Sequence, residues 1–110
     1  MTPITEPRSE ATVTICGRLG SRVEERVLPS GDTVTVFTIV VDRPRAAVGA
    51  VKVDAIACQT FRADVRRRLE RMESGAWVRA EGALRRRFWR APGGLGSAME
   101  VDVSRLRVGP

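Results

Sequence analysis

Arginines and aromatic residues alternate within one short segment of this chain, residues 81–90, which reads Glu-Gly-Ala-Leu-Arg-Arg-Arg-Phe-Trp-Arg. Guanidinium groups neutralise phosphates and flat rings stack on exposed bases, so together they hold a single-stranded nucleic acid without reading its sequence. Trp89 is one of only two tryptophans, and aromatic residues make up 5% of the chain. This segment is therefore the first candidate for a functional contact.

The composition is compatible with a polyanionic partner and offers little for catalysis. The net charge is +6, and every basic residue except Lys52 is an arginine, which suits bidentate phosphate contacts. A GC-rich genome would also enrich arginine, so charge alone supports a nucleic acid only weakly. Histidine is absent, and Cys16 and Cys58 form no CxxC pair, which excludes a zinc ligand set, a serine triad and a cysteine–histidine pair. We expect no enzyme activity, metal or cofactor.

The sequence predicts neither a membrane span nor an apolar signal region. No apolar run approaches the ~20 residues needed to span a membrane, and residues 1–10 are polar and contain no apolar signal region. The sequence predicts a flexible N-terminus over residues 1–10, a cytoplasmic (nucleoid-associated) location and no membrane partner. Reduced, small and buried thiols are the expected state of both cysteines.

The elements that must position residues 81–90 are mostly strands. Apolar and β-branched residues predict strands over 11–19 (continuing beyond a bend over 23–28), 33–41, 52–60, 76–87 and 99–108, the last with a slip before Leu106. Val65, Leu69 and Met72 follow the i, i+4, i+7 spacing of a short helix within 62–72, ended by Gly75. Five strands with one short helix between strands 3 and 4 form an all-β OB-fold barrel. One such domain is expected over residues 11–108.

Alternation along the fourth strand divides its side chains between two faces. Val78, Ala80, Gly82 and Leu84 are expected inside the barrel, and the outer face would hold Trp77, Arg79, Glu81, Arg85, Arg87 and Trp89. Arg86 and Phe88 point the other way unless a bulge intervenes. Phe61 ends the outer face of the third strand, so it shares a groove with Trp89 if the two strands are neighbours. The alternatives are that Trp89 packs at a core edge or a subunit interface, that Trp77 is a packing residue, and that the helix arginines are merely solvated.

The order of these signals resembles the bacterial single-stranded DNA-binding protein family. The resemblance is carried by residues 13–20 (Val-Thr-Ile-Cys-Gly-Arg-Leu-Gly), the hairpin tip at 28–31, residues 38–41, the helix before Gly75, and residues 81–84 followed by Arg87 and Trp89. It spans about residues 11–108 and is greatest for the short, arginine-rich actinobacterial homologues without an acidic C-terminal tail. It implies an OB fold, a homo-oligomer (a tetramer or dimer of dimers) and stacking of DNA bases on Trp89 and Phe61.

The chain also departs from that family. Ala55 stands where a third stacking tryptophan is common, and Arg45 or a neighbour stands where a fourth is found. Phe88 is a candidate to compensate, and tail-dependent recruitment of partners is not expected because the sequence stops at Gly109-Pro110. In the family the first strand lies at a subunit interface, which leaves open a disulfide between Cys16 and its symmetry mate.

Two functional hypotheses follow. The first is sequence-independent binding of single-stranded DNA in replication, repair or recombination. The alternative is an OB-fold protein-interaction module or primosome-type accessory subunit with weak nucleic-acid binding. The candidate binding residues are the aromatics Trp89, Phe61 and Phe88 and the arginines Arg18, Arg43, Arg45, Arg85, Arg86, Arg87 and Arg90.

Overall fold

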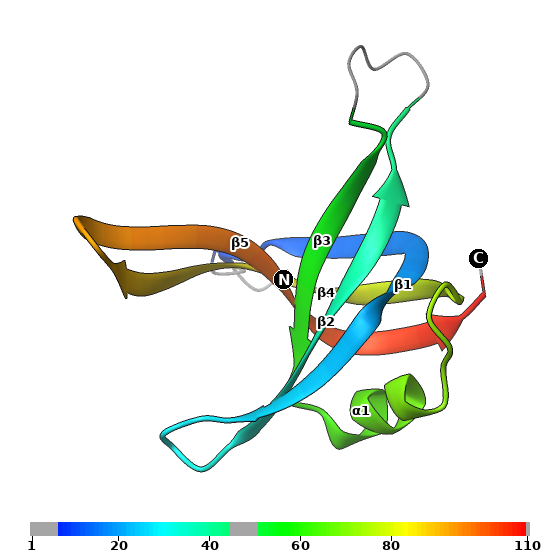
Figure 1. The fold of residues 1–110 in the computed structure, drawn as a ribbon, viewed down its shortest axis with the longest axis horizontal. Coiled ribbons are helices and arrows are strands. Elements are labelled where there is room, and N and C mark those ends of the chain that lie inside the picture. The colour runs from blue at the N-terminus through cyan, green and yellow to red at the C-terminus, as the bar shows by residue number, and fades with distance from the viewer. Residues whose placement is uncertain (1–6, 45–50, 110) are drawn as a thin grey trace, which may run out of the picture.

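Five strands and one helix follow one another in the predicted order. The computed structural model describes residues 7–44 and 51–109. Its elements are β1 (Thr12–Val27), β2 (Thr33–Asp42), β3 (Val53–Thr60), α1 (Ala63–Glu70), β4 (Trp77–Ala91) and β5 (Gly94–Val108). The strands close into a barrel in the order β1-β2-β3-β5-β4 (Figure 1). This is the architecture of an OB fold, as the sequence predicted.

The bend in β1 closes the barrel. Its first half pairs with β4, from Thr12 opposite Ala83 to Arg18 opposite Trp77. Its second half pairs with β2, and the register is irregular between Leu19 and Val23. The bend expected after residue 19 is therefore confirmed, and β1 continues beyond it to Val27 as one strand.

The core is apolar and lies between the strands and α1. Val65 and Leu69 of α1 are buried, and Met72 packs against the same cluster, which confirms the helical stripe. The buried apolar strand residues are Ile15, Leu19, Val34, Phe37, Ile39, Cys58, Val78, Ala80, Val101, Val103 and Leu106. The slip before Leu106 is also confirmed, because the β4–β5 register shifts between Glu81 and Gly82.

Strands β4 and β5 run farther than the sequence indicated. They form a hairpin that projects well beyond the barrel (Figure 1), and its outer part, residues 85–100, is called the arm below. The predicted end of β4 at residue 87 and start of β5 at residue 99 were therefore wrong. Leu95–Ala98 is poor in β-formers, and continuous pairing with β4 keeps it extended. Leu84, expected inside the barrel, is 41% exposed where the arm begins.

The two cysteines lie in different environments. Cys58 is buried, whereas Cys16 is exposed on β1, so the expectation of a buried thiol is confirmed for Cys58 and wrong for Cys16. Burial raises the pKa of the Cys58 thiol to about 12 from its ordinary value of 9.0. Among residues 7–44 and 51–109 both cysteines are free thiols.

The raised pKa of Cys58 predicts a loss of stability at alkaline pH. Above pH 9 the unfolded chain releases this proton while the folded chain keeps it until about pH 12. The free energy of unfolding should therefore fall through this range, by up to about 1.4 kcal/mol per pH unit. Urea unfolding measured at several pH values should show a shallower fall for Cys58→Ala. Equal slopes in the two proteins would contradict the prediction. Few other groups interfere, because the chain has no tyrosine and one lysine.

Candidate nucleic-acid interface

Two hairpins leave the same side of the barrel and border a groove. The β1–β2 hairpin and the β4–β5 arm both project to the left in Figure 1. At their base lies a hollow of about 250 Å³, called the groove below. It is lined by Arg22, Glu24, Arg26, Val36, Phe37, Thr38, Ala57, Cys58, Arg87 and Glu100. Its floor therefore comes from β2 and β3, and arginines from β1 and β4 stand on opposite sides of it.

Arg22 and Arg26 were missed by the sequence reasoning. They alternate with Glu24 on the second half of β1, all three line the groove, and Arg26 lies 3.6 Å from Glu24. The period-two spacing of these charges was a usable signal. The sequence predicted the bend of β1, but it did not show that this face then turns toward the arm.

The front face of the arm holds Arg85, Arg87 and Trp89. These residues lie directly opposite Glu100, Ala98 and Gly96 of β5. Directly opposed residues of an antiparallel pair share a face, so the predicted grouping of the two arginines with Trp89 is confirmed. The register is continuous from Gly82 to Ala91, and no bulge changes this alternation.

The Trp89 ring packs against Gly96 on the front face. A Cβ atom added to Gly96 would lie 2.5 Å from Cε2 of the indole, so the ring rests on a position that only glycine leaves open. The Arg87 guanidinium lies 5.1 Å from the ring centroid, in cation–π contact. Trp89 is nevertheless 42% exposed. An incoming base has to displace Arg87 or stack on its guanidinium plane, which itself stacks well.

The arginines of the front face already form ion pairs with carboxylates. Arg87 lies 3.7 Å from Glu100, and Arg85 lies 3.2 Å from Asp102. Asp102 also accepts a hydrogen bond from Gln59 of β3. A phosphate that binds here has to exchange with these carboxylates, which lowers its net gain.

Phe61 lies apart from Trp89. Strand β5 separates β3, which ends just before Phe61, from β4, which carries Trp89, so the two strands are not neighbours. Gln59 lies opposite Asp102, and Trp89 lies opposite Gly96, six residues earlier on β5. At ~3.3 Å per residue that separation is about 20 Å. Phe61 is 52% exposed at the start of α1, so both rings are accessible but do not form one stacking pair.

The other predicted arginines are divided between several places. Arg18 forms an ion pair of 2.8 Å with Asp42 and lies 5.5 Å from the Trp77 ring centroid. Trp77 is 49% exposed, so its side chain is not a core residue. Arg43 forms an ion pair of 2.8 Å with Asp54. Arg45 lies outside the described residues.

The back face of the arm carries Arg86, Phe88 and Arg90. They lie opposite Met99, Ser97 and Leu95. Arg86 donates a hydrogen bond of 3.2 Å to the Ser97 hydroxyl, and Phe88 is 62% exposed. The back face thus repeats the arrangement of arginines around an aromatic ring.

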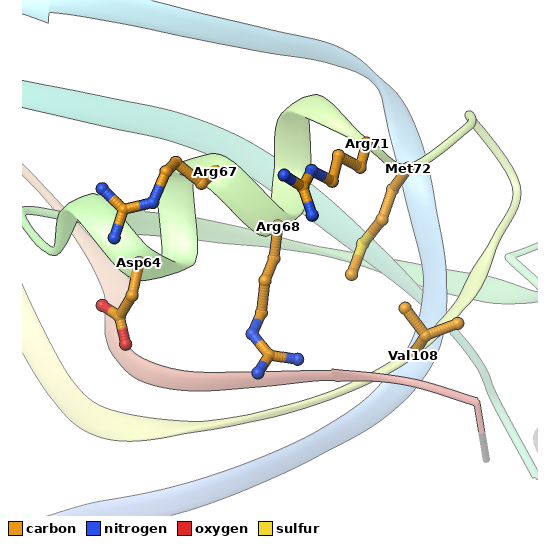
Figure 2. Close-up of a pocket in the computed structure, with 6 residues that line it drawn as sticks. All are labelled: Asp64, Arg67, Arg68, Arg71, Met72 and Val108. Carbon is orange, nitrogen blue, oxygen red and sulfur yellow. The ribbon is translucent and has the colours of Figure 1, made fainter.

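A further pocket lies between α1 and the end of β5, away from the groove. Figure 2 shows Arg67, Arg68 and Arg71 along the helix side, with Met72 and Val108 facing each other. Its volume is about 450 Å³, and none of the described residues that line it is aromatic. Asp64 also lines it but is held by Arg62, whose hydrogen bond lowers the pKa of that carboxyl. Arg67, Arg68 and Arg71 are exposed, as the solvated-face interpretation predicted, whereas Arg66 is half-buried between Glu25 and Glu70.

Neither a metal cluster nor a membrane helix is found in the described part of the chain. No three histidine, cysteine, aspartate or glutamate side chains in residues 7–44 and 51–109 lie close enough to share a metal ion. The described helix has 8 residues, too few to cross a bilayer.

Comparison with known proteins agrees with the fold. A family model described as the single-strand binding protein family matches residues 11–108. The solved structure of Plasmodium falciparum SSB in complex with ssDNA has a TM-score of 0.74 at 19% identity, covering 96% of this chain and 100% of that one. Rim1, a mitochondrial single-stranded DNA-binding protein of S. cerevisiae, has a TM-score of 0.73 at 18% identity, covering 92% and 96%. No curated protein matches in sequence.

Proposed function

The chain belongs to the single-strand binding protein family, and on that premise we propose that it binds single-stranded DNA without sequence preference, along the groove and the front face of the arm. Phosphates pass between the arginines of β1 and Arg87, and a base stacks at Trp89. The role is non-catalytic and serves replication, repair or recombination in the cytoplasm. The OB-fold domain over residues 11–108 acts within a homo-oligomer.

One observation carries the proposal. The groove places Arg22 and Arg26 of β1 opposite Arg87 of β4, and Arg87 in turn contacts Trp89. The floor between them consists of the small side chains Thr38 and Ala57 beside Val36, which leaves space for a chain of nucleotides. Basic grooves that lead to aromatic platforms bind single strands with little sequence preference.

Phe61 and the remaining arginines have secondary parts in this proposal. Phe61 stacks a base at the α1 side of the sheet, beyond the groove. Arg18 and Arg43 are already held by Asp42 and Asp54 at 2.8 Å, so they contribute mainly to the positive field. Arg45 keeps the role that the sequence assigned to it, as a candidate phosphate partner.

A salt titration tests the electrostatic part of the proposal. For single strands, log Kobs falls with log salt with a slope of about −0.7 per phosphate neutralised. The double variant Arg22→Gln/Arg26→Gln removes two groove cations and should make the slope shallower by about 1.4. Affinity for an oligothymidine is measured by anisotropy of a dye on the DNA at four or more salt concentrations.

Arg67→Gln/Arg71→Gln is the matched control. It removes the same charge from the α1 pocket, which lies outside the groove. The control slope should stay near that of the parent protein. Equal losses in both double variants would mean that net charge alone attracts DNA. Absent binding would favour the protein-interaction alternative, which a pull-down after nuclease treatment would then reveal.

A further inference from the structure

We propose that the arm holds two segments of single-stranded nucleic acid at once, one on its front face at Trp89 and one on its back face at Phe88. This inference rests on the proposed function, because it assigns the back face the same class of ligand. It starts from a difference in charge between the two faces.

The back face is the less neutralised of the two. On the front face, Arg85 and Arg87 are paired with Asp102 and Glu100. Within residues 7–44 and 51–109, no carboxylate lies within 4 Å of the guanidinium groups of Arg86 or Arg90. A phosphate on the back face therefore gains two free guanidinium groups and displaces no ion pair.

Phe88 lies between these two arginines and is accessible. Arg86 and Arg90 are two residues before and after it on β4, so all three side chains leave the same face. The hydrogen bond from Arg86 to Ser97 places that guanidinium beside the position opposite Phe88. Phe88 is 62% exposed, which leaves its ring open to a base. A site for single-stranded nucleic acid has two components, which are cations that bind the phosphates and an exposed ring on which a base stacks. Both are present here.

Apolar side chains continue the platform around Phe88. Leu95 and Met99 lie diagonally across from it on β5 and are 76% and 43% exposed. Diagonal neighbours in a sheet are within reach of an aromatic side chain. They widen the surface on which a base and its sugar can rest. An acidic protein segment is the competing occupant, and the test below separates it from a nucleic acid.

The two faces can be occupied together. Layers that pack on a sheet lie ~10 Å from it, so two strands on opposite faces are about 20 Å apart. The Debye length at physiological ionic strength is about 8 Å, so their phosphates repel each other weakly. Occupation of the front face therefore does not exclude occupation of the back face.

Counting short oligonucleotides per chain tests this inference whatever the oligomeric state. An oligothymidine of about eight nucleotides, within the 4–16 nucleotides typical of one OB fold, is titrated by calorimetry. We expect Phe88→Ala to bind one oligonucleotide fewer per chain than the parent protein. Its unfolding midpoint should be unchanged, because the truncated ring is exposed.

Single-tryptophan proteins identify the occupied face. With Trp77→Phe, Trp89 reports on the front face. With Trp77→Phe/Trp89→Phe/Phe88→Trp, the introduced tryptophan reports on the back face. We expect DNA to quench both, and the front reporter to remain quenched when Phe88→Ala is added.

Three outcomes would overturn the inference. Quenching of the front reporter alone, with unchanged stoichiometry in Phe88→Ala, would leave the proposed function standing and remove the second site. A change in sedimentation of Phe88→Ala without a change in stoichiometry would assign the back face to protein contact. The absence of quenching and of binding in every protein would overturn the proposed function as well.

Discussion

Trp89→Ala is expected to weaken binding of an oligothymidine by about 1 to 3 kcal/mol, or roughly 5- to 150-fold. The indole packs against Gly96, and the Arg87 guanidinium lies over its ring. A base that stacks there therefore meets a preorganised surface. Truncation removes the ring and also the cation–π contact that positions Arg87. The ion pair between Arg87 and Glu100 remains, so that cation is directed more strongly toward its carboxylate.

Two measurements separate this stacking from other effects of the substitution. Affinity is read from a dye on the DNA, and stacking is read from quenching of intrinsic fluorescence. Trp77→Phe is the matched control, since Trp77 is also half exposed but lies at the start of β4, away from the arm. Quenching should be lost in Trp89→Ala and kept in Trp77→Phe. The reverse pattern would transfer the stacking role to Trp77 and its partner Arg18.

The order of the strands along the chain and the faces of the arm were accessible from the sequence because they depend on local patterns. Side chains of a strand alternate whatever its partner is, so Arg85, Arg87 and Trp89 had to share a face once no bulge intervened. The slip before Leu106 was visible for the same reason. The short helix followed from the spacing of Val65 and Leu69, which the structure buries.

The charge balance of the site was not accessible, because it depends on register between strands. Glu100 and Asp102 reach Arg87 and Arg85 only through one alignment of β5 on β4. The position of β5 between β3 and β4 likewise separates Phe61 from Trp89. Arg22 and Arg26 line the groove only because the second half of β1 pairs with β2 and faces the arm. Each of these contacts is non-local, and strand propensities carry no information about it.

These non-local contacts alter the interpretation of the basic segment. The resemblance to the family singled out Trp89, which shares its face with Arg85 and Arg87. In the structure, those arginines are compensated, whereas Arg86 and Arg90 beside Phe88 have no carboxylate partner among the described residues. Stacking should therefore contribute more to the binding free energy at Trp89, and charge should contribute more at Phe88. Salt should accordingly affect binding at the back face more than at the front face.

Register also makes one glycine critical to the fold. Gly82 lies at the shift between β4 and β5, opposite Val103. A Cβ atom there would lie 2.8 Å from the carbonyl carbon of Asp102 and closer still to its oxygen. Both are backbone atoms, so no side-chain rotation relieves the overlap. The sheet has to open at the point where the barrel continues into the arm.

Gly82→Ala is therefore expected to lower the free energy of unfolding by roughly 3 kcal/mol, the upper end of the usual cost of overpacking. Urea unfolding followed by circular dichroism measures the loss. Gly20→Ala, in the bend of β1, is the matched control, because its Cβ would lie 3.1 Å from the Thr38 oxygen and require only a small shift. The control should lose no more than about 1 kcal/mol. If Gly82→Ala were as stable as Gly20→Ala, the prediction would be wrong. That result would mean that β5 can move away from β4 at this position, and that the base of the arm is not rigid.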